Sequence, residues 1–588
     1  MAVRKSSMTK IECDRVSFAY PGQQQDAGIG FSLKVEPGET VLLLGPSGSG
    51  KSTLALCLCG LIPHAVVGRL DGEVRIDGLD TRLIEPGELA CTVGTVFQDP
   101  EAQSIMATVE EEVAFGLENV GVPTSEMRGR IADALHAVSL SGFEGEPVDR
   151  LSGGQKQRLA LASVLAMKPE ILVLDEPTSN LDPVGTEDLF RKLGELKKTG
   201  RYTMVLIEHK LDELLELVDL VAVIDEKGGL LCSGAPSDVF YEHAEELAHL
   251  GVWVPVAVEL ARGLSGHGLP PESRPLSIRQ LADAVQSVLP AGLSAPAKIG
   301  RRQAADSSPL LDIRATGPLS PGNGWLQPFS LEVRRGQFWA VVGGNGAGKT
   351  TLARHLAGLL PIRSGVAFLE GRDCGTYSAR ELAGKIGYVF QNPEHQFVTE
   401  RVGEEIAFGL RASGMPEAEV AETVARYLAR FGLSDYADVH PFRLSHGEKR
   451  RLSVAAMLVA GQELMILDEP TFGQDRRHAI ELMEMMKELQ REGRTIMMIT
   501  HDMSLVAEYA EQAAVFGRGE LLSAGPVERL FADYGLLGKA GLKLPPVAEL
   551  WSLLANKTAS VHAPAVWTRR QWQMSWDNAC SIRAGTVS

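Results

Sequence analysis

The stretch GPSGSGKST, residues 45–53, decides the fold that the sequence predicts. It follows an apolar run, VLLL, residues 41–44, and apolar residues at helical spacing come after it. Glycines allow backbone N–H groups to wrap around phosphate oxygens, and a helix that begins here points its positive end at them. Lys51 would neutralise the outer phosphates, and Ser52 would hold Mg²⁺. The stretch therefore predicts a phosphate-binding loop between a strand and a helix.

The same loop occurs a second time. GGNGAGKTT, residues 343–351, follows the apolar run WAVV, and Lys349 and Thr350 take the places of Lys51 and Ser52. Two such matches after strand patterns make a chance origin negligible. The nucleotide-binding residues expected in the two loops are Gly45, Pro46, Ser47, Gly48, Ser49, Gly50, Lys51, Ser52, Thr53, Gly343, Gly344, Asn345, Gly346, Ala347, Gly348, Lys349, Thr350 and Thr351.

Further motifs repeat in the same order, about 290 residues apart, as a tandem duplication requires. The pairs are VFQDPEAQ (96–103) with VFQNPEHQ (389–396), EEVAFGL (111–117) with EEIAFGL (404–410), LSGGQKQRL (151–159) with LSHGEKRRL (444–452), and LVLDEPT (172–178) with MILDEPT (465–471). We expect a first domain over 1–262 and a second over 310–554, each ending in a helical extension. Between them, 263–309 is a Pro-rich linker with one amphipathic helix near 276–288. Residues 555–588, with Trp567, Trp572 and Trp576, are expected to form a loosely ordered tail; a membrane or partner contact is the alternative.

The apolar runs also predict the fold class. Runs such as ILVLD and TMVLI are continuous, which is typical of strands covered on both faces of a mostly parallel sheet. Residues 98–151 have a helical pattern and would be inserted between sheet elements. Each copy is therefore predicted to be an α/β domain with a mostly parallel sheet, a helical subdomain and a C-terminal helical extension.

Composition limits the functional classes. The 588 residues include 58 Lys and Arg against 75 Asp and Glu, a net charge of −17, so a general nucleic-acid coat is disfavoured. The seven cysteines are scattered without a Cys-x-x-Cys pair, as in reduced thiols. No apolar stretch is long enough to span a bilayer.

Two acidic pairs follow buried-strand patterns. Asp175 and Asp468 end apolar runs, and Glu176 and Glu469 come directly after them. An Asp at a strand end suits Mg²⁺ or its waters, and an adjacent Glu can polarise an attacking water. With a phosphate loop upstream, the catalytic interpretation is favoured over a solvated turn.

Together these motifs resemble the ATP-binding-cassette (ABC) ATPases. The resemblance covers both halves of the chain and is carried by LSGGQ upstream of LVLDEPT, a glutamine in VFQDP and a histidine in IEHK. It implies two cassettes and, as cofactors, ATP and Mg²⁺. The ATP bound to the phosphate loop of one cassette would be capped by the signature of the other. Ser152, Gly153, Gly154 and Gln155 form one signature, and Ser445 and Gly447 belong to the other. Gln98 and Gln391 are implied to contact Mg²⁺, beside Ser52, Asp175, Thr350 and Asp468, and His209 and His501 to contact the terminal phosphate.

The resemblance also suggests two unequal ATP sites. In the second signature His446 replaces a glycine and Glu448 replaces the usual glutamine. Asn180-Leu181-Asp182 fits the family's loop after the catalytic strand, whereas 472–475, FGQD, departs from it. Tyr20 fits an aromatic residue that stacks on adenine, with core packing as the alternative. The second copy has Pro318 or Leu319 near that register, so it lacks this aromatic residue unless Trp325 substitutes.

VFQ(D/N)PE and EE(V/I)AFG resemble the energy-coupling-factor (ECF) branch of these proteins, which imports vitamins, thiamine precursors and transition-metal ions. The resemblance implies an ATPase peripheral to the cytoplasmic face of a prokaryotic membrane, driving a transmembrane coupling subunit and a small substrate-capture protein. Glu110, Glu111, Glu112, Glu404 and Glu405 could receive arginines of such partners; the alternative is a solvated helix start. A duplicated ATPase of a sugar-type importer is the second candidate. A soluble ABC ATPase acting on ribosomes or DNA is the third, disfavoured because neither a charged helical linker nor an inserted zinc module or coiled coil is visible.

Overall fold

The computed structural model describes residues 9–21, 27–264, 266–267, 269–289, 309–315, 317, 319, 326–557 and 568–585. The chain divides into two compact units. The first runs to Ser265 and also includes Leu269–Leu281, and the second takes Gly266–Gly268 and the chain from Ala282 onward. The division between the units thus falls within the segment 263–309, and the expected domain bounds stay a prediction.

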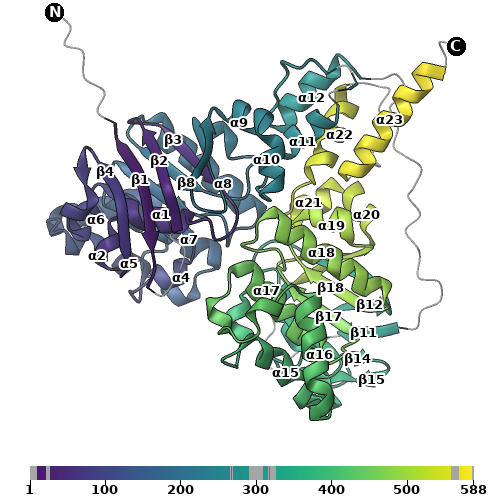
Figure 1. Cartoon of the computed structure of the whole chain (residues 1–588). Helices are drawn as coiled ribbons and strands as arrows, with labels where there is room; N and C mark the ends of the chain where they lie inside the picture. The colour runs from purple at the N-terminus through teal and green to yellow at the C-terminus, as the bar shows by residue number, and fades with distance from the viewer. Residues whose placement is uncertain are drawn as a thin grey trace, which may run out of the picture. The chain divides into compact units, whose positions relative to one another are not determined.

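The core of the first unit is a six-stranded sheet (Figure 1). Its order is β10-β9-β3-β8-β7-β6, with β10 antiparallel and the rest parallel. The strands are β3 (Thr40–Leu44), β6 (Val93–Val96), β7 (Ile171–Asp175), β8 (Thr203–Ile207), β9 (Leu220–Ile224) and β10 (Leu230–Gly234). Every residue of β3, β7 and β8 is buried, which explains their continuous apolar runs.

The second unit repeats this sheet. Its order is β16-β17-β18-β13-β19-β20, with only β20 antiparallel to its neighbour. The strands are β13 (Phe338–Val342), β16 (Ile386–Val389), β17 (Leu464–Asp468), β18 (Thr495–Ile499), β19 (Gln512–Gly517) and β20 (Glu520–Pro526). The predicted duplication and fold class are confirmed.

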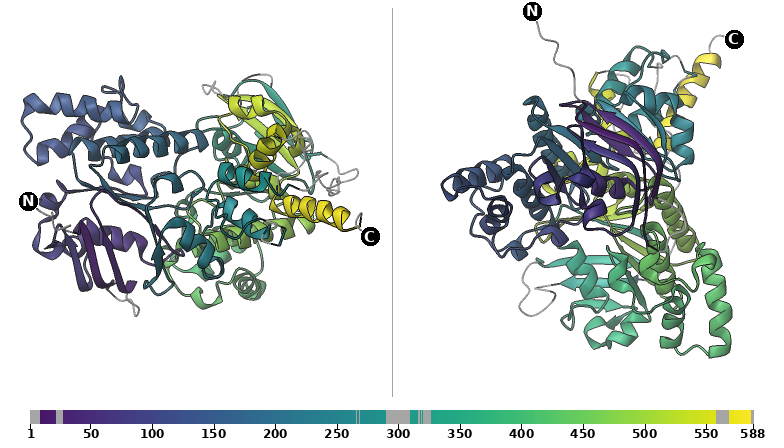
Figure 2. Two further views of the ribbon diagram at one scale, coloured as in Figure 1. Left: turned by 90° about the horizontal axis from the view of Figure 1, so that it is seen from above. Right: turned by 60° about the vertical axis from the view of Figure 1, so that its left-hand side comes forward.

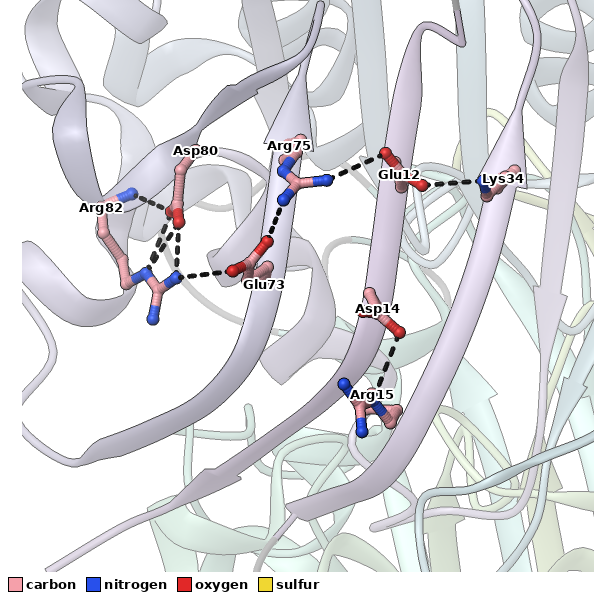
Figure 3. A network of polar contacts seen from close by, with 8 residues as sticks. All are labelled: Glu12, Asp14, Arg15, Lys34, Glu73, Arg75, Asp80 and Arg82. Carbon is pink, nitrogen blue, oxygen red and sulfur yellow. Dashed lines mark hydrogen bonds and ion pairs between the residues drawn. The ribbon is translucent and has the colours of Figure 1, made fainter.

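Each unit also carries an antiparallel sheet, ordered β2-β1-β4-β5 or β12-β11-β14-β15. The strands are β1 (Ile11–Ala19), β2 (Ala27–Val35), β4 (Arg69–Ile76), β5 (Leu79–Asp80), β11 (Pro309–Ala315), β12 (Phe329–Arg334), β14 (Ala367–Leu369) and β15 (Arg372–Asp373). One face of the first sheet is charged: Glu12 pairs with Lys34 and Arg75, and Asp80 holds Arg82 (Figure 3). Because these pairs remain partly exposed to solvent, each contributes little stability, and they mark the outward face.

A helical subdomain follows the strand that carries each VFQ motif. It comprises α5 (Val109–Asn119), α6 (Thr124–Ala137) and α7 (Gly153–Ala166) in the first unit, and α15 (Val402–Ala412), α16 (Glu417–Arg430) and α17 (His446–Leu458) in the second. The remaining helices of the two cores are α1 (Lys51–Leu58), α2 (Leu61–His64), α3 (Pro86–Leu89), α4 (Pro100–Gln103), α8 (Pro183–Lys198), α13 (Lys349–Leu356), α14 (Ala379–Ala383), α18 (Arg476–Arg491) and α19 (Met503–Tyr509), with 3₁₀ turns η1 (Thr81–Leu83), η2 (Val148–Arg150), η3 (Leu215–Leu217), η4 (Cys374–Thr376), η5 (Pro393–Gln396), η6 (Ser434–Tyr436) and η7 (Pro441–Arg443).

Each copy ends in the helical extension that the repeat predicts. The extensions consist of α9 (Pro236–Glu242), α10 (Ala244–His249) and α11 (Val256–Gly263), and of α20 (Val527–Ala532), α21 (Tyr534–Lys539) and α22 (Pro546–Lys557). The helix expected near 276–288 is α12 (Ile278–Gln286). Among the described residues, no helix has both the length and the apolar character needed to cross a bilayer.

The C-terminal tail departs from the expectation of a loosely ordered segment. Residues Arg569–Gly585 form helix α23, which can be followed in yellow in Figure 2. Trp572 and Trp576 are fully buried, and the Trp572 ring lies edge-on to Trp551 of α22, with 6.3 Å between ring centroids. Spaced one helical turn apart, the two tryptophans form one apolar stripe that packs on the extension. Trp567 lies outside the described residues.

This packing predicts that Trp572→Ala releases α23. A buried Trp truncated to Ala costs about 3–5 kcal/mol of packing. We expect faster tryptic cleavage after Arg569 and Arg570 in the native protein, read by mass spectrometry over time. Met574→Ala, on the exposed side of the same helix, is the control and should cleave at the wild-type rate. Equal rates for Trp572→Ala and wild type would contradict the packing described.

Candidate functional site

The two predicted phosphate loops have the same local geometry. Gly50 and Gly348 precede α1 and α13 in the left-handed conformation, with φ of 92° and 97°, which favours glycine. The ammonium of Lys51 donates hydrogen bonds to the carbonyls of Gly45 and Pro46, and that of Lys349 to those of Gly343 and Gly344. Each lysine therefore lies inside its own loop, at the N-terminus of the following helix, where anions bind favourably.

The two strand-end aspartates lie beside these loops. Asp175 and Asp468 end β7 and β17 and are buried. Ser52 hydrogen-bonds to Asp175, and the Thr350 hydroxyl donates to Asp468 at 3.2 Å. Burial, opposed by the Ser52 hydrogen bond, raises the pKa of Asp175 to about 6, and burial likewise raises the pKa of Asp468. Each pair brings a hydroxyl and a carboxylate together, as the sequence predicts for a metal site.

Glu176 and Glu469 have an unusual backbone conformation in both units. Their φ angles are +46° and +45°, in the left-handed region that non-glycine residues adopt rarely. Their N–H groups donate to the carbonyls of Ile207 and Ile499 at the ends of the neighbouring strands, at 2.9 and 3.0 Å. Strain of this kind persists where the surrounding structure enforces it, and it is concentrated at functional sites.

The predicted histidines contact these glutamates. His209 Nε2 lies 3.2 Å from Glu176 Oε1, and His501 Nδ1 lies 2.8 Å from Glu469 Oε1. In the first unit the Gln98 amide also donates to Glu176 Oε2, at 2.8 Å. Within each unit the structure therefore brings the phosphate loop, the aspartate, the glutamate and the histidine together at the carboxyl ends of parallel strands.

Tyr388 is a site residue that sequence reasoning missed. Its hydroxyl donates to Asp468 Oδ2 at 2.8 Å, and burial raises the pKa of this tyrosine. The first copy has Thr95 at the same position of strand β6, and Asp175 Oδ1 is buried without a hydrogen-bond partner among the described residues. An aromatic residue in an apolar strand reads as core packing, and only the register with Asp468 identifies its second role.

Two other missed residues surround the histidines. Glu208 is buried and accepts hydrogen bonds from the Thr178 hydroxyl and from the His209 N–H. The second copy has Thr500 in its place, and that hydroxyl donates to Glu469 at 3.3 Å. The acidic residue in IEHK was a visible signal, because a buried carboxylate needs donors.

Ser152 and Ser445 form N-terminal caps. The Ser152 hydroxyl accepts from the Gln155 N–H and the Gln155 side chain accepts from the Ser152 N–H; Ser445 and Glu448 make the same pair. This capping box accepts either Gln or Glu at its third helical position. Glu448 therefore does not disturb the start of the helix, although a glutamate at this position departs from the family pattern.

His446 is matched by a second change. A Cβ atom on Gly473 would lie 3.2 Å from the His446 ring, so the glycine leaves room for the imidazole. In the first copy Gly153 faces Asn180, with the sizes reversed. The departures in FGQD and in the signature are thus two sides of one contact, in which the large and the small residue have changed places between the copies. Asp475 still caps α18, as Asp182 caps α8.

Tyr20 lies next to the first loop. Its hydroxyl is 3.0 Å from the Thr53 hydroxyl, and its half-buried ring packs edge-on against Phe18. In the second copy Leu319 is buried, and Pro318 and Trp325 lie outside the described residues. The adenine-stacking role of Tyr20 stays a prediction.

Comparisons with known proteins agree with this geometry. The family model described as "ABC transporter" matches residues 30–179 and 326–472, one stretch in each copy. The chain is 40% identical to a "Putative ABC transporter ATP-binding protein" of Methanosarcina acetivorans, over 94% of this chain and 91% of that protein. It is 38% identical to the "Putative HMP/thiamine import ATP-binding protein YkoD" of Bacillus subtilis, over 91% of this chain and 95% of that protein.

A solved structure also matches part of the chain. It is cbiO1 of Clostridium perfringens, described as part of the ABC transporter complex cbiONQ, with 31% identity over 41% of this chain and 94% of that one, at a TM-score of 0.36. Both units contain the same site at the strand ends. The relatives that match over nearly their full length and the family match in both copies show that the chain belongs to the ABC transporter ATP-binding proteins and carries two of their ATPase domains.

Proposed function

We propose that this chain is the ATP-hydrolysing energy-coupling subunit of an ECF-type importer for a vitamin, a thiamine precursor or a transition-metal ion. It would act from the cytoplasmic face of a prokaryotic membrane, on a transmembrane coupling subunit and a small substrate-capture protein. The observation that carries the proposal is the likeness, over nearly the full length of both chains, to a relative named for HMP/thiamine import.

The residues of each site fit a nucleotide with Mg²⁺. Asp175 keeps a buried oxygen without a hydrogen-bond partner among the described residues, and a hydroxyl lies beside each aspartate. Carboxylate and hydroxyl oxygens are the ligands that Mg²⁺ prefers, so Ser52 with Asp175, and Thr350 with Asp468, would hold the ion, joined by Gln98 and Gln391. When bound, Mg²⁺ offsets the negative charge of the phosphate oxygens.

The remaining steps belong to the chain's own side chains. Lys51 and Lys349 leave the loop carbonyls for the outer phosphates. Glu176 and Glu469 each polarise an attacking water, and the contacts with His209 and His501 orient these carboxylates. The left-handed backbone aims each glutamate before nucleotide arrives, so less reorganisation is required during the reaction.

An exposed apolar residue follows the glutamine loop in each copy and supports a protein partner. Ile105 and Val398 occupy equivalent positions, and each is 67% exposed. The buried carboxylate of Glu112 accepts from the N–H groups of Ile105 and Met106, and that of Glu405 from those of Val398 and Thr399. In both copies a buried carboxylate holds the same loop so that an apolar side chain is exposed, and this points to a docking surface for a partner.

These contacts change the interpretation of the acidic helix starts. Glu112 and Glu405 are buried and hold the loop, Glu111 completes a capping box with Thr108, and Glu404 pairs with Arg411. They already have partners within the chain, so receiving arginines from a coupling helix is not their main role. Partner recognition is assigned instead to the apolar residues of the loop.

Affinity purification from the native membrane in mild detergent tests the proposal. We expect a polytopic coupling subunit and a small membrane protein to co-purify, identified by mass spectrometry. Two ordinary permeases with a substrate-binding protein would establish the sugar-type alternative. Ribosomal proteins or DNA without membrane proteins would mean that the import function is wrong.

The docking loop predicts a separation of binding from hydrolysis. Ile105→Asp combined with Val398→Asp should abolish co-purification, because a charge replaces the apolar contact, while ATPase activity of the purified chain stays within about twofold. Leu83→Asp, at an 85% exposed apolar residue elsewhere, is the control and should retain the partner. Unchanged co-purification in the double variant would refute the docking role.

The differences around the two glutamates predict unequal hydrolysis. Glu176→Gln and Glu469→Gln, made separately, should lower steady-state ATP turnover by different factors, and the double variant should lose about 10²–10⁴-fold. Glu195→Gln, on an exposed face of α8, controls for the loss of a carboxylate. Equal losses in the two single variants would show that the sites are equivalent.

A further inference from the structure

The two signature helices differ at one buried position. Gln157 of α7 and Arg450 of α17 occupy the same place in LSGGQKQRL and LSHGEKRRL, and their exposed fractions are 1% and 0%. A fully buried guanidinium is costly unless its surroundings compensate it. The identity of its partners therefore indicates what this arginine does.

Arg450 donates hydrogen bonds to two consecutive backbone carbonyls of the second glutamine loop. Its Nη1 donates to the Phe390 carbonyl and its Nη2 to the Gln391 carbonyl. Burial lowers the pKa of Arg450 to about 10, and the nearby charges of Asp468 and Glu469 oppose this shift, so the side chain stays charged at neutral pH. The fork of the guanidinium thus joins the signature helix to the loop at two points.

Two further contacts join the same helix to the same loop. Lys449 of α17 forms an ion pair with Glu394 at 2.6 Å, and the Gln396 amide donates to the Ser453 carbonyl at 2.7 Å. The second glutamine loop is therefore held to α17 along its length, from Phe390 to Gln396.

The glutamine loop of the first copy is held differently. Both amide atoms of Gln157 are buried without a hydrogen-bond partner among the described residues. The Gln98 carbonyl accepts instead from the Ser179 hydroxyl, at 3.4 Å, and Gln103 bonds to its own strand end, at the Thr95 carbonyl and the Phe97 N–H. Among the described residues, Gln157 therefore does not make the hydrogen bonds to this loop that Arg450 makes in the second copy.

The side chains of the two loop glutamines also differ in their contacts with the neighbouring glutamate. The Gln98 amide donates to the catalytic-candidate carboxylate of Glu176, at 2.8 Å. Within the described residues no hydrogen bond joins the Gln391 side chain to Glu469, whose contacts include His501 and Thr500. The two carboxylates therefore differ in their neighbours: Glu176 accepts from the amide of its own glutamine loop, whereas the oxygens of Glu469 contact Thr500 and His501, which follow strand β18.

We propose that Arg450 is a positioning residue that ties the second glutamine loop to its signature helix and so fixes the place of the Gln391 backbone. In the first copy Gln157 stands in this place and does not hydrogen-bond to the loop among the described residues, and Gln98 donates to Glu176. The inference rests on the ATPase assignment and not on the import function.

Hydrogen–deuterium exchange of the purified full chain without nucleotide tests the tie directly. In Arg450→Gln, amides of residues 390–397 should exchange at least about tenfold faster, because the loop loses two charge-assisted hydrogen bonds. Arg451→Gln removes the neighbouring arginine of the same helix and should leave these rates unchanged. Arg450→Lys, which keeps the charge but not the fork, should give intermediate rates.

The outcomes decide the proposal in each case. Equal exchange in Arg450→Gln and Arg451→Gln would overturn it, and so would unchanged exchange in Arg450→Gln. If Arg450→Gln does not fold, Arg450→Lys is decisive, and wild-type exchange in that variant would refute the bidentate tie. None of these readouts depends on a membrane partner, so a failed co-purification leaves the test intact.

A second measurement asks whether the tie matters for turnover. In the Glu176→Gln background, where hydrolysis depends on Glu469, Arg450→Gln should raise the Mg²⁺ concentration for half-maximal ATPase rate severalfold, because Gln391 is no longer positioned. The reciprocal Gln157→Arg in the Glu469→Gln background should lower that concentration. An unchanged Mg²⁺ requirement in both would show that Arg450 acts only in packing.

Discussion

A backbone hydrogen bond at the ends of two neighbouring strands sets the geometry of each proposed ATP site. Glu176 N–H donates to the Ile207 carbonyl and Glu469 N–H to the Ile499 carbonyl, directly after the last residue pair of each parallel ladder. This bond holds the left-handed turn of each glutamate. It also fixes the distance from the glutamate to the histidine that follows the adjacent strand, and the phosphate loop on the next strand completes the site.

On this shared frame the two copies have diverged in coupled sets of residues. The second copy has a large residue, His446, facing Gly473, whereas the first copy has Gly153 facing Asn180. Glu448 preserves the cap that Gln155 makes. Such changes keep the backbone of the site and alter what surrounds it. The duplication thus allows one copy to vary while the strand ends that carry the chemistry stay the same.

The largest differences from expectation lie where a side chain changes partners. The acidic residues after the glutamine loop look like a docking surface in sequence, but burial turns Glu112 and Glu405 into acceptors for their own loop. The tail looks irregular in sequence, yet Trp572 and Trp576 lie one helical turn apart on α23, and Trp572 packs against Trp551 of α22. In both cases a distant segment decides the role of the residue.

The sequence by itself determined the duplication, the α/β class, both phosphate loops and the Asp-Glu and His residues, because these depend on local patterns: apolar runs, glycine spacing and motif order. Only the tertiary structure decided the roles of Tyr388, Glu208 and Arg450. Each acts through a hydrogen bond to a group far away in sequence, on another strand or loop. A residue type alone does not name its partner; the register of the sheet and the packing of the helices do.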